Sequence, residues 1–370
     1  MAPFKLPEYR EPHFGEIPFK NAPNARTALA PSDGIAPSDF HVLSIFPEYF
    51  KVEADSGKNE WLLPAESRMD CVPVLRKSAS GPWIDAVEFR NLKRGDMVVV
   101  GRTEDGSEGI YVDSSAFSGS EKTPKDAFAF RTGRSRETAY SRDYDELYEL
   151  LSYEKEHGYI IWVLGPAVSF DYDSRHAMKS IIEKGYAHVI MAGNALATHD
   201  LEGALFKTAL GQDIYTQESR ANGHYNHLDL LNLVRGHGSI EKLIEMEKVD
   251  DGIVHAALKK GIPLVLTGSI RDDGPLPEVY GNVYEAQDAM RAHMRKATTV
   301  MALATQLHTI AVGNITPSYA LRDGKVRPVY FYSIDISEFA VNKLRDRGTL
   351  SVVPIVTNVQ DFLVLLKNNL

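Results

Sequence analysis

The feature that most restricts the fold is a series of short, continuously apolar runs after residue 140, separated by segments with helical periodicity. Such runs are typical of strands buried on both faces of a parallel sheet. The expected strands are Tyr159–Leu164, His188–Met191, Pro263–Leu266, Thr299–Ala302, Val329–Ile334 and Ser351–Val356. The expected helices include Tyr144–His157, Ser174–Lys184, 198–210, 226–249, 251–260, Val283–Lys296, Glu338–Arg347 and Val359–Leu366. Strands that alternate with helices predict an α/β fold with a Rossmann-like, doubly wound, mostly parallel sheet over residues 140–370.

The N-terminal part of the chain differs in its proline content and in its apolar pattern. Residues 1–37 hold seven of the 19 prolines and almost no apolar periodicity, which predicts a Pro-rich arm. Short β-like runs follow and predict a smaller β-rich N-terminal domain over residues 38–135. The Ser/Thr/Arg-rich segment 115–140 is the expected linker.

Composition excludes several classes of protein. A net charge of −9, without a Lys/Arg run, argues against nucleic acid as a partner. The single cysteine, Cys71, cannot form an internal disulfide and suits a reducing compartment; we interpret it as a small strand residue rather than a nucleophile. No uninterrupted apolar run is long enough to span a membrane, and the N-terminus does not resemble a secretory signal. We therefore expect a soluble, cytoplasmic protein.

Small and polar residues follow every expected strand of the α/β part. In doubly wound sheets, ligands bind outside the carboxyl ends of the strands. Six such coincidences favour a nucleotide-sized cleft. The segments concerned are 165–167, 192–195, 267–274, 305–308, Asp335 and 357–358.

Asp335 is the residue in this pattern that most specifically indicates a ligand. An acid at the end of a Rossmann strand can accept hydrogen bonds from both ribose hydroxyls of adenosine, and it repels a 2′-phosphate, which favours NAD over NADP. Capping of the next helix is the alternative. The first strand lacks the G-x-G-x-x-G sequence that usually holds the pyrophosphate. The turn at Gly193-Asn194-Ala195 could present N–H groups to a phosphate, or Asn194 could simply cap a helix.

Four histidines and a charged loop are further candidates. His199-Asp200 could orient a substrate amine or shuttle protons, or the histidine could be structural. His224 and His227 offer too few matched ligands for zinc, so we predict no metal site. The loop residues Arg271, Asp272 and Asp273 could form a salt-bridged turn, or could bind the carboxylate and amine of an amino acid. His308 could lie in the core or contact a ligand.

Long motifs in the second half resemble one family. They are Gly165–Val168, Ala192–Asp200, Gly268–Pro277, Ala304–His308, Ala311–Asn314 and Asp335. The chain is similar to the LOR/SDH-domain family, which includes archaeal ornithine cyclodeaminases and the C-terminal part of arginine dihydrolase/ornithine cyclodeaminase enzymes. The resemblance implies a tightly bound NAD. The implied cofactor contacts are Asn194, Ala195, Asp273, Thr305, Gln306, Leu307, His308, Asp335, Thr357 and Asn358.

The resemblance also implies an activity, the conversion of L-ornithine to L-proline and ammonia. Hydride leaves the amino-bearing carbon, the δ-amine attacks the resulting imine, ammonia departs and the hydride is returned. We expect catalytic roles for His199, Asp200 and Asp272. Substrate binding is expected from Arg271, His224 and His227. Another amino-acid or diamine substrate and a non-catalytic NAD-binding regulatory module remain alternatives, and a homo-oligomer is expected.

The front half and two loops depart from the family. The histidine-rich loop at 223–227 is less basic than expected, and Leu321–Pro328 resembles an insertion. We expect these segments to lie where the substrate, rather than the cofactor, is recognised.

Overall fold

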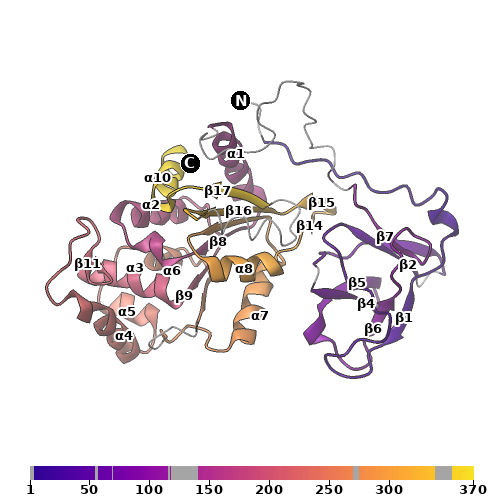
Figure 1. Cartoon of the computed structure of the whole chain (residues 1–370), viewed down its shortest axis with the longest axis horizontal. Coiled ribbons are helices and arrows are strands. Elements are labelled where there is room, and N and C mark those ends of the chain that lie inside the picture. The colour runs from indigo at the N-terminus through magenta and orange to yellow at the C-terminus, as the bar shows by residue number, and fades with distance from the viewer. Residues whose placement is uncertain are drawn as a thin grey trace.

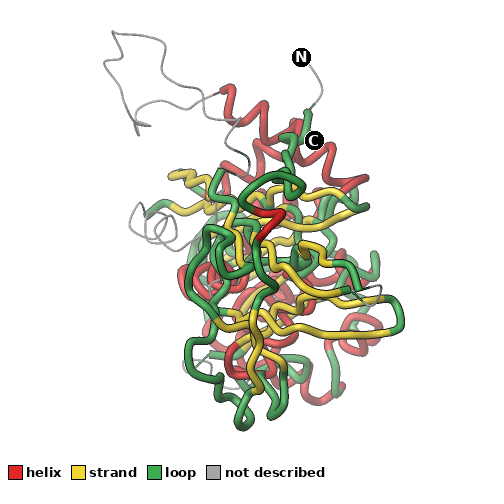
Figure 2. The backbone as a smooth tube through the Cα atoms, turned by 90° about the vertical axis from the view of Figure 1, so that its right-hand side faces the viewer, coloured by secondary structure: helices red, strands yellow, loops and turns green. Residues whose placement is uncertain are grey.

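The computed structural model describes residues 4–54, 57–68, 70–115, 117, 141–269, 275–337 and 352–370. A β-rich N-terminal part and an α/β part lie beside each other, with the β-rich part on the right of Figure 1. Figure 2 faces that side and shows its strands and loops toward the viewer. None of the described helices is long and apolar enough to cross a bilayer.

A six-stranded, wholly parallel sheet forms the centre of the α/β part. Its strands are β8 (Ile160–Leu164), β9 (Val189–Gly193), β12 (Leu264–Thr267), β13 (Thr299–Leu303), β16 (Tyr330–Asp335) and β17 (Val352–Val356). Their spatial order is β12-β9-β8-β13-β16-β17. Numbered along the chain, this is the 3-2-1-4-5-6 order of dinucleotide-binding folds. The predicted Rossmann-like α/β fold is confirmed.

Helices cover both faces of this sheet, and each face has its own apolar core. One core includes residues of α1 (Ser141–His157), α2 (Tyr172–Glu183), α3 (Asn194–Phe206), α4 (Asn226–His237), α5 (Ile240–Met246), α6 (Ile253–Lys259) and α10 (Val359–Asn369). The other includes residues of α7 (Val283–Met294) and α8 (Gln306–Ile315). Strand side chains alternate between the two: Trp162 belongs to the first core and Val163 to the second. Burial on both faces explains why these strands are continuously apolar.

The β-rich part contains two antiparallel sheets. One has four strands in the order β1 (Arg26–Leu29), β6 (Met97–Val100), β4 (Cys71–Ser78) and β5 (Gly81–Glu88). The other consists of β3 (Asn59–Leu62), β2 (Glu48–Glu53) and β7 (Ile110–Val112). Strand β1 lies inside the expected Pro-rich arm. It is a mostly exposed edge strand, so it carries little apolar periodicity that a sequence pattern could reveal.

Three further expectations can be compared with the structure. The helix expected at 226–249 is divided because Gly238 adopts φ +84° and ends α4, after which Ser239 caps α5. The stretch Leu321–Pro328 belongs to a hairpin of β14 (Tyr319–Arg322) and β15 (Lys325–Pro328). The expected helix Glu338–Arg347 and most of the expected linker lie outside the described residues.

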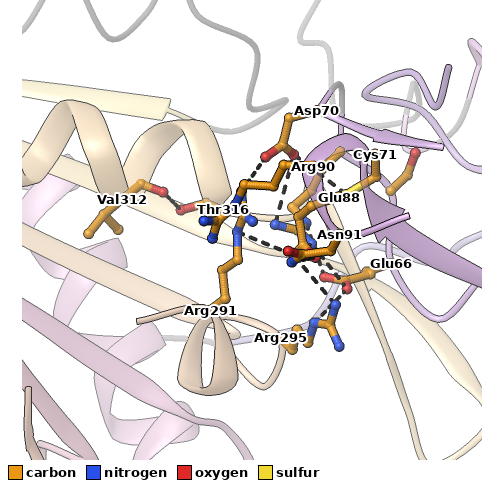
Figure 3. Close-up of polar contacts among 12 residues, drawn as sticks. Glu66, Asp70, Cys71, Glu88, Arg90, Asn91, Arg291, Arg295, Val312 and Thr316 are labelled. Carbon is orange, nitrogen blue, oxygen red and sulfur yellow. Dashed lines mark hydrogen bonds and ion pairs between the residues drawn. The ribbon is translucent and has the colours of Figure 1, made fainter. Parts of the chain in front are cut away.

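Charged side chains join the β-rich part to α7, as Figure 3 shows. The α7 ion-pair network consists of Glu66, Arg68, Asp70, Glu88, Arg291 and Arg295. Within it, Glu88 accepts from Arg68 at 2.8 Å and lies 3.2 Å from the Nε of Arg291. Because Glu88 and Arg291 are both buried, each depends on its partners for compensation of its charge.

We expect the stability of Glu88→Gln to decrease less steeply with falling pH than that of the wild type. Burial raises the pKa of Glu88, but the hydrogen bond and charge of Arg68 and the charge of Arg291 outweigh it, and the pKa falls to about 2. This carboxylate therefore stabilises the fold fully above its unfolded pKa of about 4.3, and that stabilisation is lost as the pH falls toward 2. Thermal unfolding midpoints measured from about pH 5 to about pH 2 would show a shallower decline for the variant than for the wild type. The exposed Glu60→Gln is the control; equal slopes for Glu88→Gln and the wild type would contradict the assignment.

Candidate functional site

The carboxyl ends of the six strands lie in one row across the sheet. Backbone pairing aligns the last core residues of the strands, which are Leu266, Ala192, Leu164, Leu303, Ile334 and Ile355. The residues that follow them therefore share one edge, which includes Gly165, Gly193, Ala304 and Asp335. This is the edge at which an open α/β sheet binds its ligands.

The centre of this edge is the point where the strand order reverses, between β8 and β13. Here the two strand-end turns touch. The N–H of Gly165 donates to the carbonyl of Leu303 at 2.8 Å, and Ala304 adopts φ +52°. A Cβ on Gly165 would overlap the carbonyl oxygen of Ala304. Glycine is thus required at 165 by the close approach of two backbones.

We expect Gly165→Ala to destabilise the protein or to separate these turns. The added methyl meets backbone rather than a flexible side chain, so the cost is about 1–3 kcal/mol or more. Gly236→Ala is the matched control, because an added Cβ there has nothing within 4 Å and helix α4 favours alanine. Urea unfolding would measure both. Equal stability of Gly165→Ala and the wild type would contradict the predicted clash.

Two helices begin at this edge without a side-chain cap. Helix α3 follows β9 with Gly193 at the N-cap position, and α8 follows β13 with Thr305 at that position. By contrast, α10 is capped by Asn358. First-turn N–H groups that lack a capping side chain can bind an anion such as a phosphate. Both helix starts therefore suit a dinucleotide.

The predicted cofactor residues around β13 and β16 gather on one half of the edge. Thr305 contacts His308 (Oγ1 to Nδ1, 3.1 Å) at the start of α8, where Gln306 and Leu307 are exposed. The ring of His308 reaches across to β9, since a Cβ on Gly193 would lie 2.8 Å from its Cε1.

Asp335 is half-buried at the end of β16, where its Oδ1 accepts from the N–H of Ser337 at 2.8 Å. The backbone carbonyl of Asp335 also accepts a hydrogen bond from the N–H of Thr357. The side-chain oxygen of Asn358 accepts a hydrogen bond from the N–H of Gln360 and so caps α10. Asp335 therefore lies next to Thr357 and Asn358.

On the other half, three aromatic rings from separate elements meet. Phe170 follows the turn after β8, His199 lies in α3 after β9, and His227 lies in the first turn of α4. The ring of His199 lies 5.3 Å from that of Phe170 and 5.2 Å from that of His227. His199 also contacts Glu202, with 3.0 Å between Nδ1 and Oε2. His199 and His227 are thus brought together, as expected of residues that share a site.

Other candidates on this half are placed differently. His224 is exposed, and its ring contacts Tyr225 at 4.3 Å. Asn194 is the first residue of α3 rather than its cap, and its Oδ1 accepts from the N–H of Leu276 at 2.9 Å. Ala195 follows in the same turn. Arg271, Asp272 and Asp273 lie outside the described residues.

Asp200 has an environment that favours a structural role over the expected catalytic one. It is fully buried and accepts from the Nε of Arg175 at 2.7 Å. It also accepts from the N–H groups of Ile253 and Val254, at 3.0 and 2.8 Å, and so caps α6. With these donors in place its carboxylate has no access to a substrate, which corrects the expectation.

Sequence reasoning missed Glu202 and Phe170. Glu202 carried a usable signal, because it lies three residues after His199 and such residues are neighbours on a helix. Phe170 carried none, since only the tertiary fold brings it to His199.

Similarity to known proteins covers nearly the whole chain. A family model for the C-terminal, Rossmann-fold part of arginine dihydrolase ArgZ-like proteins matches residues 147–366. Ornithine cyclodeaminase of Methanopyrus kandleri is 34% identical over 363 residues, which are 95% of this chain and 79% of that protein.

Two crystal structures extend this comparison. A conserved LOR/SDH protein of Methanococcus maripaludis has a TM-score of 0.81 at 32% identity, over 94% of this chain and 98% of that one. The ternary complex of AgrE with ornithine and NAD+ has a TM-score of 0.57 at 28% identity, over 96% and 46% of the two chains.

Proposed function

Because this chain belongs to the family of the ArgZ-like C-terminal Rossmann proteins, we propose that it binds NAD and converts L-ornithine to L-proline and ammonia. Relatives that carry the name ornithine cyclodeaminase, and the AgrE complex that contains ornithine and NAD+, support both the substrate and the cofactor. L-Ornithine is an amino acid with two amines, which several polar side chains can orient.

The position of Asp335 carries the cofactor assignment. The 3-2-1-4-5-6 sheet consists of two halves that start at β8 and at β13. Asp335 ends β16, the second strand of the second half, which is the place of the ribose-binding acid in such a half. The adenosine therefore belongs over β13, β16 and β17, which explains why the turn after β8 lacks a phosphate-binding glycine sequence.

The residues present fit a dinucleotide on this plan. The uncapped start of α8 would hold the pyrophosphate, and Gly165 itself adds no side chain where the two strand-end backbones approach each other. When bound, NAD supplies an acceptor that takes a hydride and can return it.

The nicotinamide and the substrate then belong over β8, β9 and β12. There we assign a proton-transfer role to His199 and substrate contacts to His227 and His224. Arg271 is assigned to the substrate carboxylate, while Asp272 and Asp273 are assigned to the amine and the cofactor. Positioning of the reacting carbon is the main contribution of these side chains.

Purified protein tests the proposal directly. Denaturation should release NAD, and incubation with L-ornithine should yield proline and ammonia in equal amounts. Bound NAD without ornithine turnover would exclude the cyclodeaminase and leave another amino-acid substrate or a regulatory module; a screen of amino acids for ammonia release separates these two. A cytoplasmic location and a homo-oligomer stay predictions, which cell fractionation and light scattering can check.

A further inference from the structure

Glu202 is a fully buried carboxylate held by four donors. Its Oε1 accepts from the Oγ1 of Thr208 at 2.8 Å and from Gly211 N–H at 3.1 Å. Its Oε2 lies 3.2 Å from Leu210 N and 3.0 Å from the Nδ1 of His199. Burial raises the pKa of Glu202, but the hydrogen bonds from His199, Gly211 and Thr208 outweigh it and lower the pKa.

An ionised carboxylate only accepts hydrogen bonds, so its contact with His199 requires the hydrogen on Nδ1. A neutral His199 then has its lone pair on Nε2. In the part of the chain that the structure describes, no hydrogen bond to this Nε2 is formed. The His199 ring contacts the rings of Phe170 and His227, with centroids 5.3 and 5.2 Å away, and these contacts restrict its orientation.

We propose that Glu202 is a positioning residue that sets His199 as the proton acceptor of this site. On the proposed function, on which this inference rests, one proton moves from a substrate ammonium to Nε2 of His199. The amine gains a lone pair and His199 becomes an imidazolium. Glu202 takes no proton; it stabilises the positive charge through Nδ1–H, as carboxylates paired with catalytic histidines do.

A metal ion is the competing use of the same side chains. His199, Glu202 and His227 offer one ligand atom each within 4.8 Å of one another. However, both oxygens of Glu202 already accept two hydrogen bonds each. A site with only three protein ligands, one of them a carboxylate whose oxygens already accept hydrogen bonds, fits a proton-transfer pair better than a closed metal site.

Glu202→Gln is the central test, because glutamine keeps the shape but can donate to Nδ1 and so favours the opposite tautomer of His199. We expect kcat for ornithine to fall by roughly 10²- to 10⁴-fold, with KM and bound NAD nearly unchanged. Glu241→Gln, an exposed change in α5, should leave kcat unaltered. A rise in KM, or loss of bound NAD, in place of the fall in kcat would overturn the proposal.

A double variant separates positioning from a general structural effect. If Glu202 acts through His199, adding Glu202→Gln to His199→Asn should lower kcat little further, whereas independent effects would multiply. A multiplied loss would overturn the proposal. So would a metal ion present in equimolar amount in the wild type and absent from Glu202→Gln, measured by elemental analysis.

A readout without turnover distinguishes failure of this inference from failure of the proposed function. Nitrogen-15 NMR of the wild-type protein, with the His199 signals assigned through His199→Asn, reports which ring nitrogen bears hydrogen. We expect hydrogen on Nδ1. Hydrogen on Nε2 in the neutral ring would overturn the inference even if Glu202→Gln does not fold. Hydrogen on Nδ1 without ornithine turnover would support the positioning by Glu202 and refute only the cyclodeaminase.

Discussion

Replacement of Arg175 by leucine should lower the free energy of unfolding by about 3–5 kcal/mol, the usual cost of removing one partner of a buried ion pair. Arg175 is fully buried between α2, α3 and α6, where it contacts Asp200 and Asp251. Burial lowers the pKa of Arg175, but the two carboxylates outweigh it and raise the pKa, so the guanidinium stays charged. Without it, Asp200 remains in the interior with only backbone donors.

Urea unfolding of Arg175→Leu against Arg220→Leu measures this effect. Arg220 also pairs with an aspartate, Asp213, but it is half-exposed, so solvent screens the pair and the loss should be much smaller. Similar losses for the two variants would show that the Arg175 contacts add nothing beyond a surface pair. The comparison also tests Asp200, because a capping role for this residue predicts loss of stability rather than a selective loss of turnover.

Replacement of Asp335 by alanine should weaken NAD binding roughly 10- to 150-fold, which corresponds to about 1.5–3 kcal/mol for hydrogen bonds to a charged group. The same change removes the repulsion of a 2′-phosphate, so the preference for NAD over NADP should shrink. Because the Oδ1 of Asp335 also accepts from Ser337, a small loss of stability is expected as well.

Calorimetric titration of the cofactor-free protein with NAD and with NADP would measure both effects. Asp323→Asn, in the exposed turn of the β14–β15 hairpin, serves as the control, because this hairpin precedes the amino end of β16 whereas Asp335 lies at its carboxyl end. Unchanged NAD affinity in Asp335→Ala would refute the ribose assignment, and with it the placement of adenosine over the second half of the sheet.

The parallel sheet was predictable because its strands are buried on both faces. The continuously apolar run Tyr159–Leu164, with similar runs elsewhere in the same half of the chain, predicts a buried strand. Strand β8 confirms it. The resemblance to the LOR/SDH family is likewise confirmed by relatives that match nearly the whole chain. Strand β1 escaped prediction because an edge strand buries little and is defined by its pairing with β6.

The site was less predictable because roles depend on tertiary contacts. Nothing in His199-Asp200 reveals that the first residue meets Phe170 and His227 while the second caps α6. Adjacent residues on a helix point in directions about 100° apart, so neighbours in sequence can serve different parts of the molecule. The same argument explains why Glu202, three residues on, shares the environment of His199.

The ion pairs that join α7 to the β-rich part also constrain how such a chain can change over generations. Loss of Arg291 alone would leave Glu88 buried without one of its cations, and loss of Glu88 alone would leave the buried Arg68 and Arg291 without their shared carboxylate. Substitutions at 88 and 291 are therefore not independent of each other. We therefore expect substitutions at this interface to occur as compensated changes, whereas exposed strands and turns of the front half can change one residue at a time.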